Sequence, residues 1–255
     1  MVMIIIIKNM TKQPEIPDFR RLGCQFAFFF HQKDQQPVFE SNCERFLSAS
    51  IIKVPILLAW LHLERQGLVD SHELCDLDSE PQVQGAGFSW LMGARKLPYH
   101  DVLLMMISLS DNLCTNLVIE KVGRERLTNV IQQDLGLKGT ELQRKLMDYA
   151  AREKGLDNWI TAQDCIKLFD LVDALPTQQR EIAEAMLISN QDDALLKRNI
   201  PRDTVDFYHK TGSISNVLHD WGYTRSCRIF LLMQNVKAEP PAFEVFGQAG
   251  EWMLQ

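Results

Sequence analysis

The spacing of apolar and polar residues divides the chain into a strand-like start, a long helical middle and a strand-like end. Residues 22–31 (LGCQFAFFFH) are apolar and aromatic, residues 32–36 are polar, and Pro37-Val38-Phe39 resumes the apolar pattern, which predicts a β-hairpin. From Lys53 onward, apolar residues recur at helical spacing. This periodicity predicts helices over residues 53–66, 102–109, 113–122, 124–134, 162–175 and 178–187.

Beyond Pro201 the pattern becomes strand-like again. Residues 204–209 (TVDFYH) alternate, and residues 227–233 (CRIFLLM) form a nearly continuous apolar run typical of a buried strand. Residues 243–254 predict a closing helix. Because the strand regions stand at opposite ends of the chain, we predict an α+β fold with one antiparallel sheet made from both ends.

The expected organisation is a single domain of two lobes, residues 1–255. An α/β/α sheet lobe comprises about residues 1–48 and 198–255, and an all-helical lobe comprises about residues 49–197. A cleft between two such lobes is the expected ligand site.

Composition and charge exclude several classes of protein. Lys plus Arg number 27 and Asp plus Glu number 33, so the net charge is −6. An acidic chain without long basic runs argues against nucleic acid as a partner. No apolar run approaches the ~20 residues that a membrane-spanning helix needs, so we expect no membrane partner either. Residues 1–8 are apolar but resemble a signal peptide poorly, which favours a cytoplasmic location.

Cysteine and histidine spacing indicates neither a metal nor another cofactor. The six cysteines include no C-x-x-C pair, and a chain of this length builds a core without disulfides, so we expect reduced, buried thiols. The six histidines are scattered without metal-ligand spacing. The sequence leaves the oligomeric state open.

Three short motifs carry candidate chemistry. The first is S-x-x-K at Ser50–Lys53, at the start of a predicted helix. Residues three apart share a helix face, so the Lys53 amine can approach the Ser50 hydroxyl. A serine is a weak nucleophile until a base takes its proton, and burial among isoleucines disfavours the charged form of Lys53. Ser50 is therefore the candidate nucleophile and Lys53 its base.

The second motif is Ser110-Asp111-Asn112, on a turn between two predicted helices. Short polar side chains are common on such turns. We predict that Ser110 relays a proton and that Asn112 binds a substrate amide.

The third motif is Lys210-Thr211-Gly212, followed by Ser213, at the end of the predicted strand 204–209. Lys210 and Thr211 are candidates for binding a substrate carboxylate. Gly212 would let an acyl group approach the backbone closely. The N–H groups of Ser213 and Ser50 are candidates for an oxyanion hole.

Each motif alone is weak evidence, but together, in this order, they form the signature of class A β-lactamases and penicillin-binding proteins. The sequence resembles this family over about residues 22–254, including residues 46–53 and 186–210 around the motifs. The resemblance implies the two-lobed β-lactamase/transpeptidase-like fold. It also implies acylation of Ser50 by a β-lactam ring.

One feature departs from the family. Class A enzymes carry a glutamate, on a loop, that activates the water releasing the acyl group. In this chain its place falls near Leu146, and Asp148 is the nearest carboxylate, so we take Asp148 as the candidate base and Glu153 as the next. The other interpretation is that Asp148 stabilises the loop by pairing with Arg144 or Arg152.

The predicted activity is that of a serine hydrolase of class A β-lactamase type, acting on a small β-lactam or related acyl substrate. Two alternatives use the same residues. One is a D-alanyl-D-alanine peptidase or small esterase, and the other is a penicillin-binding sensor that deacylates slowly.

Overall fold

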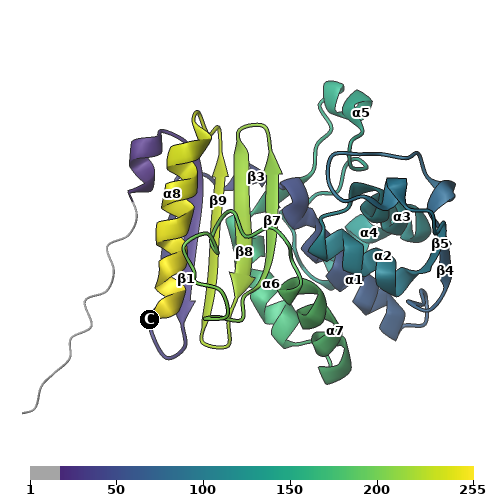
Figure 1. The fold of residues 1–255 in the computed structure, drawn as a ribbon. Coiled ribbons are helices and arrows are strands. Elements are labelled where there is room, and N and C mark those ends of the chain that lie inside the picture. Colours follow the sequence, from purple (N-terminus) through teal and green to yellow (C-terminus); the bar gives the residue numbers. More distant parts are fainter. Residues whose placement is uncertain (1–17) are drawn as a thin grey trace, which may run out of the picture.

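In a computed structural model that describes residues 18–255, one antiparallel sheet joins the two ends of the chain (Figure 1). Its strand order is β2-β1-β9-β8-β7, and each neighbouring pair is antiparallel. The predicted sheet from both chain ends is thus confirmed. The strands are β1 (Gln25–Gln32), β2 (Val38–Ser41), β7 (Tyr208–Ile214), β8 (Val217–Tyr223) and β9 (Cys227–Gln234).

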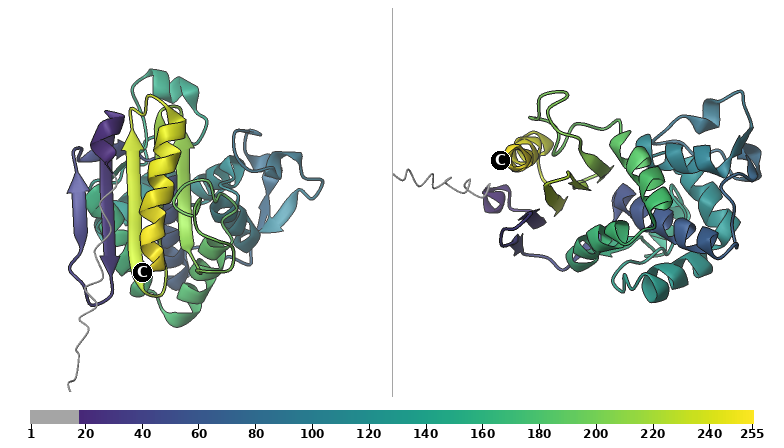
Figure 2. Two further views of the ribbon diagram at one scale, coloured as in Figure 1. Left: turned by 60° about the vertical axis from the view of Figure 1, so that its left-hand side comes forward. Right: turned by 90° about the horizontal axis from the view of Figure 1, so that it is seen from below.

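Helices cover both faces of this sheet (Figure 2). Successive residues of a strand point to opposite faces. Phe28 accordingly packs in the core beneath α8 (Glu239–Gly250), while Phe29 packs in the other core, against Phe169 of α6 (Ala162–Asp173), with ring centroids 5.9 Å apart. The sheet is thus buried on both sides, which explains the continuous apolar runs in its central strands.

The rest of the chain between the two strand regions is mainly helical. Helix α1 (Lys53–Arg65) continues from a 3₁₀ turn, Ala49–Ile52, and residues 53–61 are all buried. It therefore lies in the core of the helical lobe rather than at its surface. The other helices are α2 (Tyr99–Ser108), α3 (Asn112–Val122), α4 (Arg124–Asn129), α5 (Tyr149–Glu153) and α7 (Thr177–Ile188).

The hairpin and the six helices predicted in the middle of the chain are present, with two helical boundaries to correct. The α-helix predicted over 124–134 ends at Asn129 and continues as a π-helical turn, Val130–Asp134. The closing helix begins at Glu239, earlier than predicted, because prolines are tolerated in a first helical turn.

The strand predicted over residues 204–209 is wrong in its boundaries. Strand β7 begins at Tyr208, and the motif Lys210-Thr211-Gly212 lies within it rather than at its end. Its neighbour β8 ends at Tyr223, opposite Tyr208, so residues 204–207 have no strand to pair with. The alternation in this stretch instead reflects a loop that buries Phe207.

Two pairs of three-residue strands were not predicted, because segments so short carry no measurable periodicity. Strand β3 (Arg45–Leu47) pairs with β6 (Trp159–Thr161), and β4 (Leu74–Asp76) pairs with β5 (Lys96–Pro98). The β3–β6 pair holds residue 158 beside residue 48, since the Ser48 N–H donates to the Asn158 carbonyl at 2.9 Å.

Two sequence expectations concern features outside the sheet. No helix within residues 18–255 is long and apolar enough to cross a membrane. All six cysteines are free and five are buried. The N-terminal residues 1–8, on which the expected location depends, lie outside the described residues.

Candidate active site

Ser50 lies in the 3₁₀ turn that leads into α1, one turn before Lys53. The preceding Ala49 has a positive φ of 44°, a conformation unusual for alanine. Backbone strain of this kind is concentrated at functional sites. The turn thus presents Ser50, which is half-buried, at the edge of a rigid apolar helix.

The side chain of Lys53 lies among four oxygen atoms. Its Nζ is 3.1 Å from Ser50 Oγ, 3.0 Å from Ser110 Oγ and 2.6 Å from the Ser110 carbonyl oxygen. It is also 3.0 Å from Asn112 Oδ1. The side chain is fully buried, and this burial, with the charge of Lys210 as a smaller cause, holds the pKa of Lys53 well below its ordinary value. An amine at this distance from a serine hydroxyl has the geometry of a general base.

The turn Ser110–Asn112 is held in place by its central residue. The buried Asp111 carboxylate accepts hydrogen bonds from Ser89 N–H at 2.9 Å and Ser89 Oγ at 2.7 Å. It also caps α3 by accepting from the Cys114 N–H at 3.0 Å. Asp111 thus fixes the left-handed backbone of Ser110, whose φ is 55°, and the position of Asn112 beside Lys53. The sequence motif did not reveal this positioning role.

Lys210 is fully buried, and its Nζ donates to the Thr211 carbonyl oxygen at 2.8 Å. Burial lowers the pKa of Lys210 to about 8, although the carboxylates of Asp192 and Asp220 oppose the shift. The electrostatic coupling of Lys210 to Lys53 means that two cationic groups share this region.

Gly212 allows β7 to approach the turn that carries Ser50. A Cβ atom at Gly212 would lie 2.9 Å from the Ser50 nitrogen and 3.0 Å from the Ile51 nitrogen. The structure therefore explains why position 212 is a glycine: a side chain there would prevent the close contact between β7 and the turn that carries Ser50. The sequence had suggested a different role, the close approach of an acyl group to the backbone. Ser213, the next residue, is exposed.

A hollow of about 370 Å³ opens above these motifs, a size suited to a small ligand. Ser50, Asn112 and Ser213 line its floor. Leu146, Met147 and Tyr149, from the loop between residues 143 and 158, line it as well. Part of the lining is thus apolar. The candidate nucleophile faces this space directly.

Two buried asparagines hold the loop over the hollow. The Leu146 N–H donates to Asn116 Oδ1 at 2.7 Å, and Asn116 Nδ2 donates to the Leu146 carbonyl at 3.0 Å. Asn158 Oδ1 accepts from the N–H groups of Gln143 and Arg144 at 2.9 and 3.1 Å. The apolar side chain of Leu146 is therefore held at the edge of the hollow.

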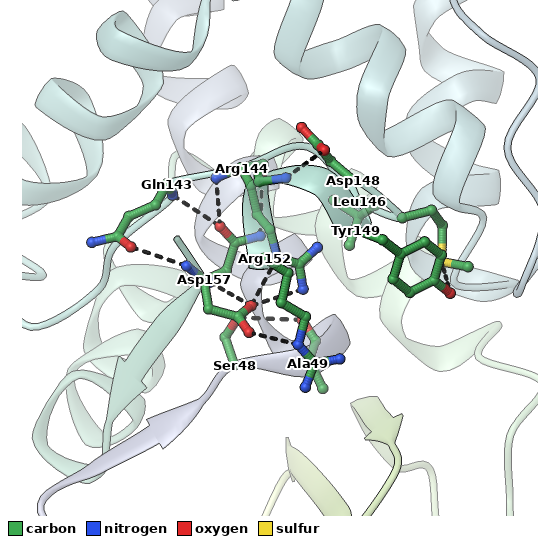
Figure 3. Close-up of polar contacts among 12 residues, drawn as sticks. Ser48, Ala49, Gln143, Arg144, Leu146, Asp148, Tyr149, Arg152 and Asp157 are labelled. Atoms are coloured by element: carbon green, nitrogen blue, oxygen red, sulfur yellow. Dashed lines mark hydrogen bonds and ion pairs between the residues drawn. The ribbon is translucent and has the colours of Figure 1, made fainter. Parts of the chain in front are cut away.

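Among the described residues that line the hollow, Asp157 supplies the one carboxylate. It is nearly buried and is paired with Arg144 at 2.7 Å and Arg152 at 3.2 Å (Figure 3). Both arginines thus hold this carboxylate in ion pairs. Arg144 and Arg152, which the alternative interpretation of the sequence paired with Asp148, thus pair with Asp157 instead.

Asp148 does not line the hollow. It is exposed, and its carboxylate accepts the Ala151 N–H at 2.9 Å as the N-cap of α5. Figure 3 shows this side chain pointing away from Ala49. Glu153, at the other end of α5, is also exposed and outside the hollow. The geometry of Asp148 corresponds to the loop-stabilising interpretation, with a helix cap in place of an ion pair.

The described residues contain no group of three or more His, Cys, Asp or Glu side chains placed to hold a metal ion. The groups at and beside the hollow are a serine, a lysine with a lowered pKa, a hydroxyl, an amide and backbone N–H groups. These groups suit acyl transfer to serine.

The sheet covered by helices on both faces, with a helical lobe beside it, is the β-lactamase/transpeptidase-like fold. Residues 16–254 match the model of the β-lactamase enzyme family, so the chain belongs to that family. No curated protein matches the sequence. This membership confirms the resemblance seen in the three motifs.

Solved structures of similar fold include enzymes and a penicillin-binding protein. A β-lactamase from Sphaerobacter thermophilus DSM 20745 is 22% identical, with a TM-score of 0.81 and 92% of each chain covered. An acyl-enzyme complex of a leucine-to-glutamate mutant of PBP-A with penicillin G is 22% identical, with a TM-score of 0.80 and coverage of 91% of this chain and 90% of that one. A class A β-lactamase from Bacteroides cellulosilyticus DSM 14838 is 19% identical, with a TM-score of 0.75 and 90% of each chain covered.

Proposed function

We propose that this protein is a serine acyl-transfer enzyme that opens β-lactam rings through an ester on Ser50, and that this ester is hydrolysed slowly. The observation that carries the proposal is the placement of Lys53 Nζ at hydrogen-bond distance from Ser50 Oγ and Ser110 Oγ. The apolar residue at position 146 supports the slow second step.

Acylation follows from these groups. Neutral Lys53 takes the proton of the Ser50 hydroxyl as Oγ attacks the β-lactam carbonyl carbon. The N–H groups of Ser50 and Ser213 stabilise the oxyanion that forms. The carbon–nitrogen bond then breaks, and the proton passes from Lys53 through the Ser110 hydroxyl to the leaving nitrogen. The nitrogen stays tethered to the acyl group, because the ring was a cyclic amide.

Substrate binding uses the remaining motif residues. Lys210 and Thr211 attract the carboxylate that β-lactams carry, and Asn112 binds the substrate amide. The positive charge of Lys210 favours an anionic substrate.

Deacylation needs a base that activates water. Neither Asp148 nor Glu153 lines the hollow, and Asp157 is held by two arginines. Without such a base, water attack on the ester is slow, and Asp148 has no part in it.

The test is the lifetime of the acyl-enzyme. Intact-mass spectrometry after mixing with penicillin G should show one adduct on the wild type and none on Ser50→Ala. Leu146→Glu should shorten the lifetime by about a hundredfold, the low end of general-base effects. Leu146→Gln, equal in size but without a base, should not. Equal labelling of the wild type and Ser50→Ala would contradict the assignment of Ser50 as the nucleophile. Rapid turnover of penicillin G by the wild type would contradict the prediction that the acyl-enzyme is hydrolysed slowly.

A second candidate is a peptidase acting on peptides that end in D-alanyl-D-alanine. The apolar position 146 favours it, as does the similar fold of PBP-A. Release of D-alanine from N-acetylated lysyl-D-alanyl-D-alanine, absent in Ser50→Ala, would support the peptidase. If penicillin acylates the protein but no D-alanine is released from the peptide, the peptidase is excluded, and a slow β-lactamase or a penicillin-binding sensor remains.

A further inference from the structure

A second hollow, of about 480 Å³, lies at the other end of the sheet. It is bordered by the first residue of β7, the last of β8, the first two of β9 and the ends of α6 and α7 (Figure 1). Tyr208 lines it, whereas Ser213, five residues along the same strand, lines the candidate active site. At ~3.4 Å per residue these two points are roughly 17 Å apart, so the hollows are separate. We call this one the arginine hollow.

Its lining is positively charged although the whole chain is acidic. Four lysine and arginine side chains contribute, against two carboxylates, whereas the chain as a whole has a net charge of −6. The basic residues are Lys33, Arg180, Arg225 and Arg228. A concave surface of one sign of charge attracts ligands of the opposite sign.

Two of the four cations are already neutralised. Arg180 pairs with Asp173 at 3.0 Å and with Glu184 at 2.9 Å. Arg228 pairs with Asp170 at 2.9 Å and also with Asp173. These ion pairs stabilise the side of the hollow formed by α6, α7 and β9. An anionic ligand would therefore bind to the other two cations, Lys33 and Arg225.

The Arg225 side chain is exposed. Among residues 18–255 it forms one hydrogen bond, a long one of 3.4 Å to the Tyr208 hydroxyl, and no ion pair. Lys33, also exposed, has no ion pair in the same part of the chain. Both charges are thus available at the mouth of the hollow. A guanidinium suits a carboxylate in particular, because its N–H groups match the two oxygens.

The inner wall is aromatic and carries one unused hydrogen-bonding group. The rings of Tyr208 and Tyr223 stack 5.2 Å apart at 16°. Tyr223 is 7% exposed, and its buried hydroxyl has no hydrogen-bond partner among the described residues. Burial raises the pKa of Tyr223, so the group remains a donor. A buried hydroxyl without a partner is destabilising, and a ligand oxygen would satisfy it.

We propose that the arginine hollow binds a small aryl carboxylate. The carboxylate pairs with Arg225 and Lys33 and accepts a hydrogen bond from the Tyr223 hydroxyl, while the flat ring packs on the tyrosine wall. An inorganic anion would leave the aromatic wall unused, and a neutral ring would leave both cations unpaired.

Calorimetric titration of the full chain tests this with three probes. Benzoate combines ring and charge, benzyl alcohol has the ring alone, and sulfate has the charge alone. Benzoate is expected to bind at one site, at least about tenfold more tightly than either of the others. Sulfate binding as tightly as benzoate would overturn the proposal, and so would the absence of benzoate binding.

Variants locate the site. Arg225→Gln and Tyr223→Phe should each weaken benzoate binding roughly tenfold, as expected for a hydrogen bond to a charged group. Arg126→Gln, on an exposed face of α4, is the matched control and should leave binding unchanged. Lys210→Ala should also leave it unchanged, because that lysine does not line the arginine hollow and lies near Lys53 instead. Loss of binding in Lys210→Ala, or full binding in Arg225→Gln, would overturn the assignment.

Discussion

Replacing Gly212 by alanine tests whether the contact between β7 and the Ser50 turn governs reactivity. The new Cβ would lie 2.9 Å from the Ser50 nitrogen, about 0.5 Å closer than ordinary van der Waals contact. Both atoms that it meets most closely belong to the backbone, so no flexible side chain can move aside. The strand and the turn must separate instead.

The cost can be estimated from this geometry. Overpacking a rigid contact by one methyl group destabilises a fold by about 1–3 kcal/mol. For a chain of this size each kcal/mol lowers Tm by roughly 2–4 °C. A displacement of the Ser50 turn that approaches 1 Å would slow acylation by about a hundredfold. Reactivity should therefore fall much more than stability.

The assays are thermal denaturation and the rate of adduct formation with penicillin G, followed by mass spectrometry. Gly93→Ala is the matched control, because a Cβ there meets nothing within 4 Å and its φ is not positive. The reasoning is refuted if Gly212→Ala acylates at the wild-type rate, or if Gly93→Ala loses as much stability as Gly212→Ala does.

Three further substitutions test the other groups. Lys53→Arg replaces the neutral amine by a guanidinium that stays protonated and cannot act as a base, so the rate of adduct formation should fall by about 10²–10⁴-fold, and an unchanged rate would exclude Lys53 as the base. The pKa of Lys210 is about 8, and its charged form attracts the substrate carboxylate, so KM for an anionic β-lactam should rise as pH increases through about 8. Lys210→Ala should abolish that dependence, and a neutral ester should show little of it in steady-state assays. Asp148→Ala should remove the α5 cap at a cost of about 1 kcal/mol in chemical denaturation, while a change in acyl-enzyme lifetime would restore Asp148 as a candidate base.

The sequence predicted the parts of this molecule that follow from periodicity or from short-range spacing. Ser50 and Lys53 share a helix face because they are three residues apart, and β1 and β9 are apolar enough to be recognised as strands. The position of β7 depended instead on where its partner β8 ends, which periodicity in residues 204–209 does not report.

The side-chain contacts of the loop over the site could not be predicted from the sequence for a similar reason. Asp148 and Asp157 are both aspartates near arginines, and only the three-dimensional path of the loop assigns one to a helix cap and the other to two ion pairs. The sequence placed the family's glutamate position near Leu146 but did not show what holds this residue. The residue that holds Leu146 is Asn116 on α3, outside the loop and 30 residues earlier in the sequence, and nothing local connects the two.

Building the sheet from both chain ends also sets the order in which the molecule can be assembled during synthesis. An isolated two-stranded hairpin is at best marginally stable, so β1 and β2 wait for β9, which is made only after the helical block. Helices α2, α3 and α4 contact their neighbours in sequence, and contacts of this local kind can form while the chain is still growing. The turn with Ser50 is thus synthesised long before β7 brings Gly212 against it, and the site is complete only once β7 has been translated and paired.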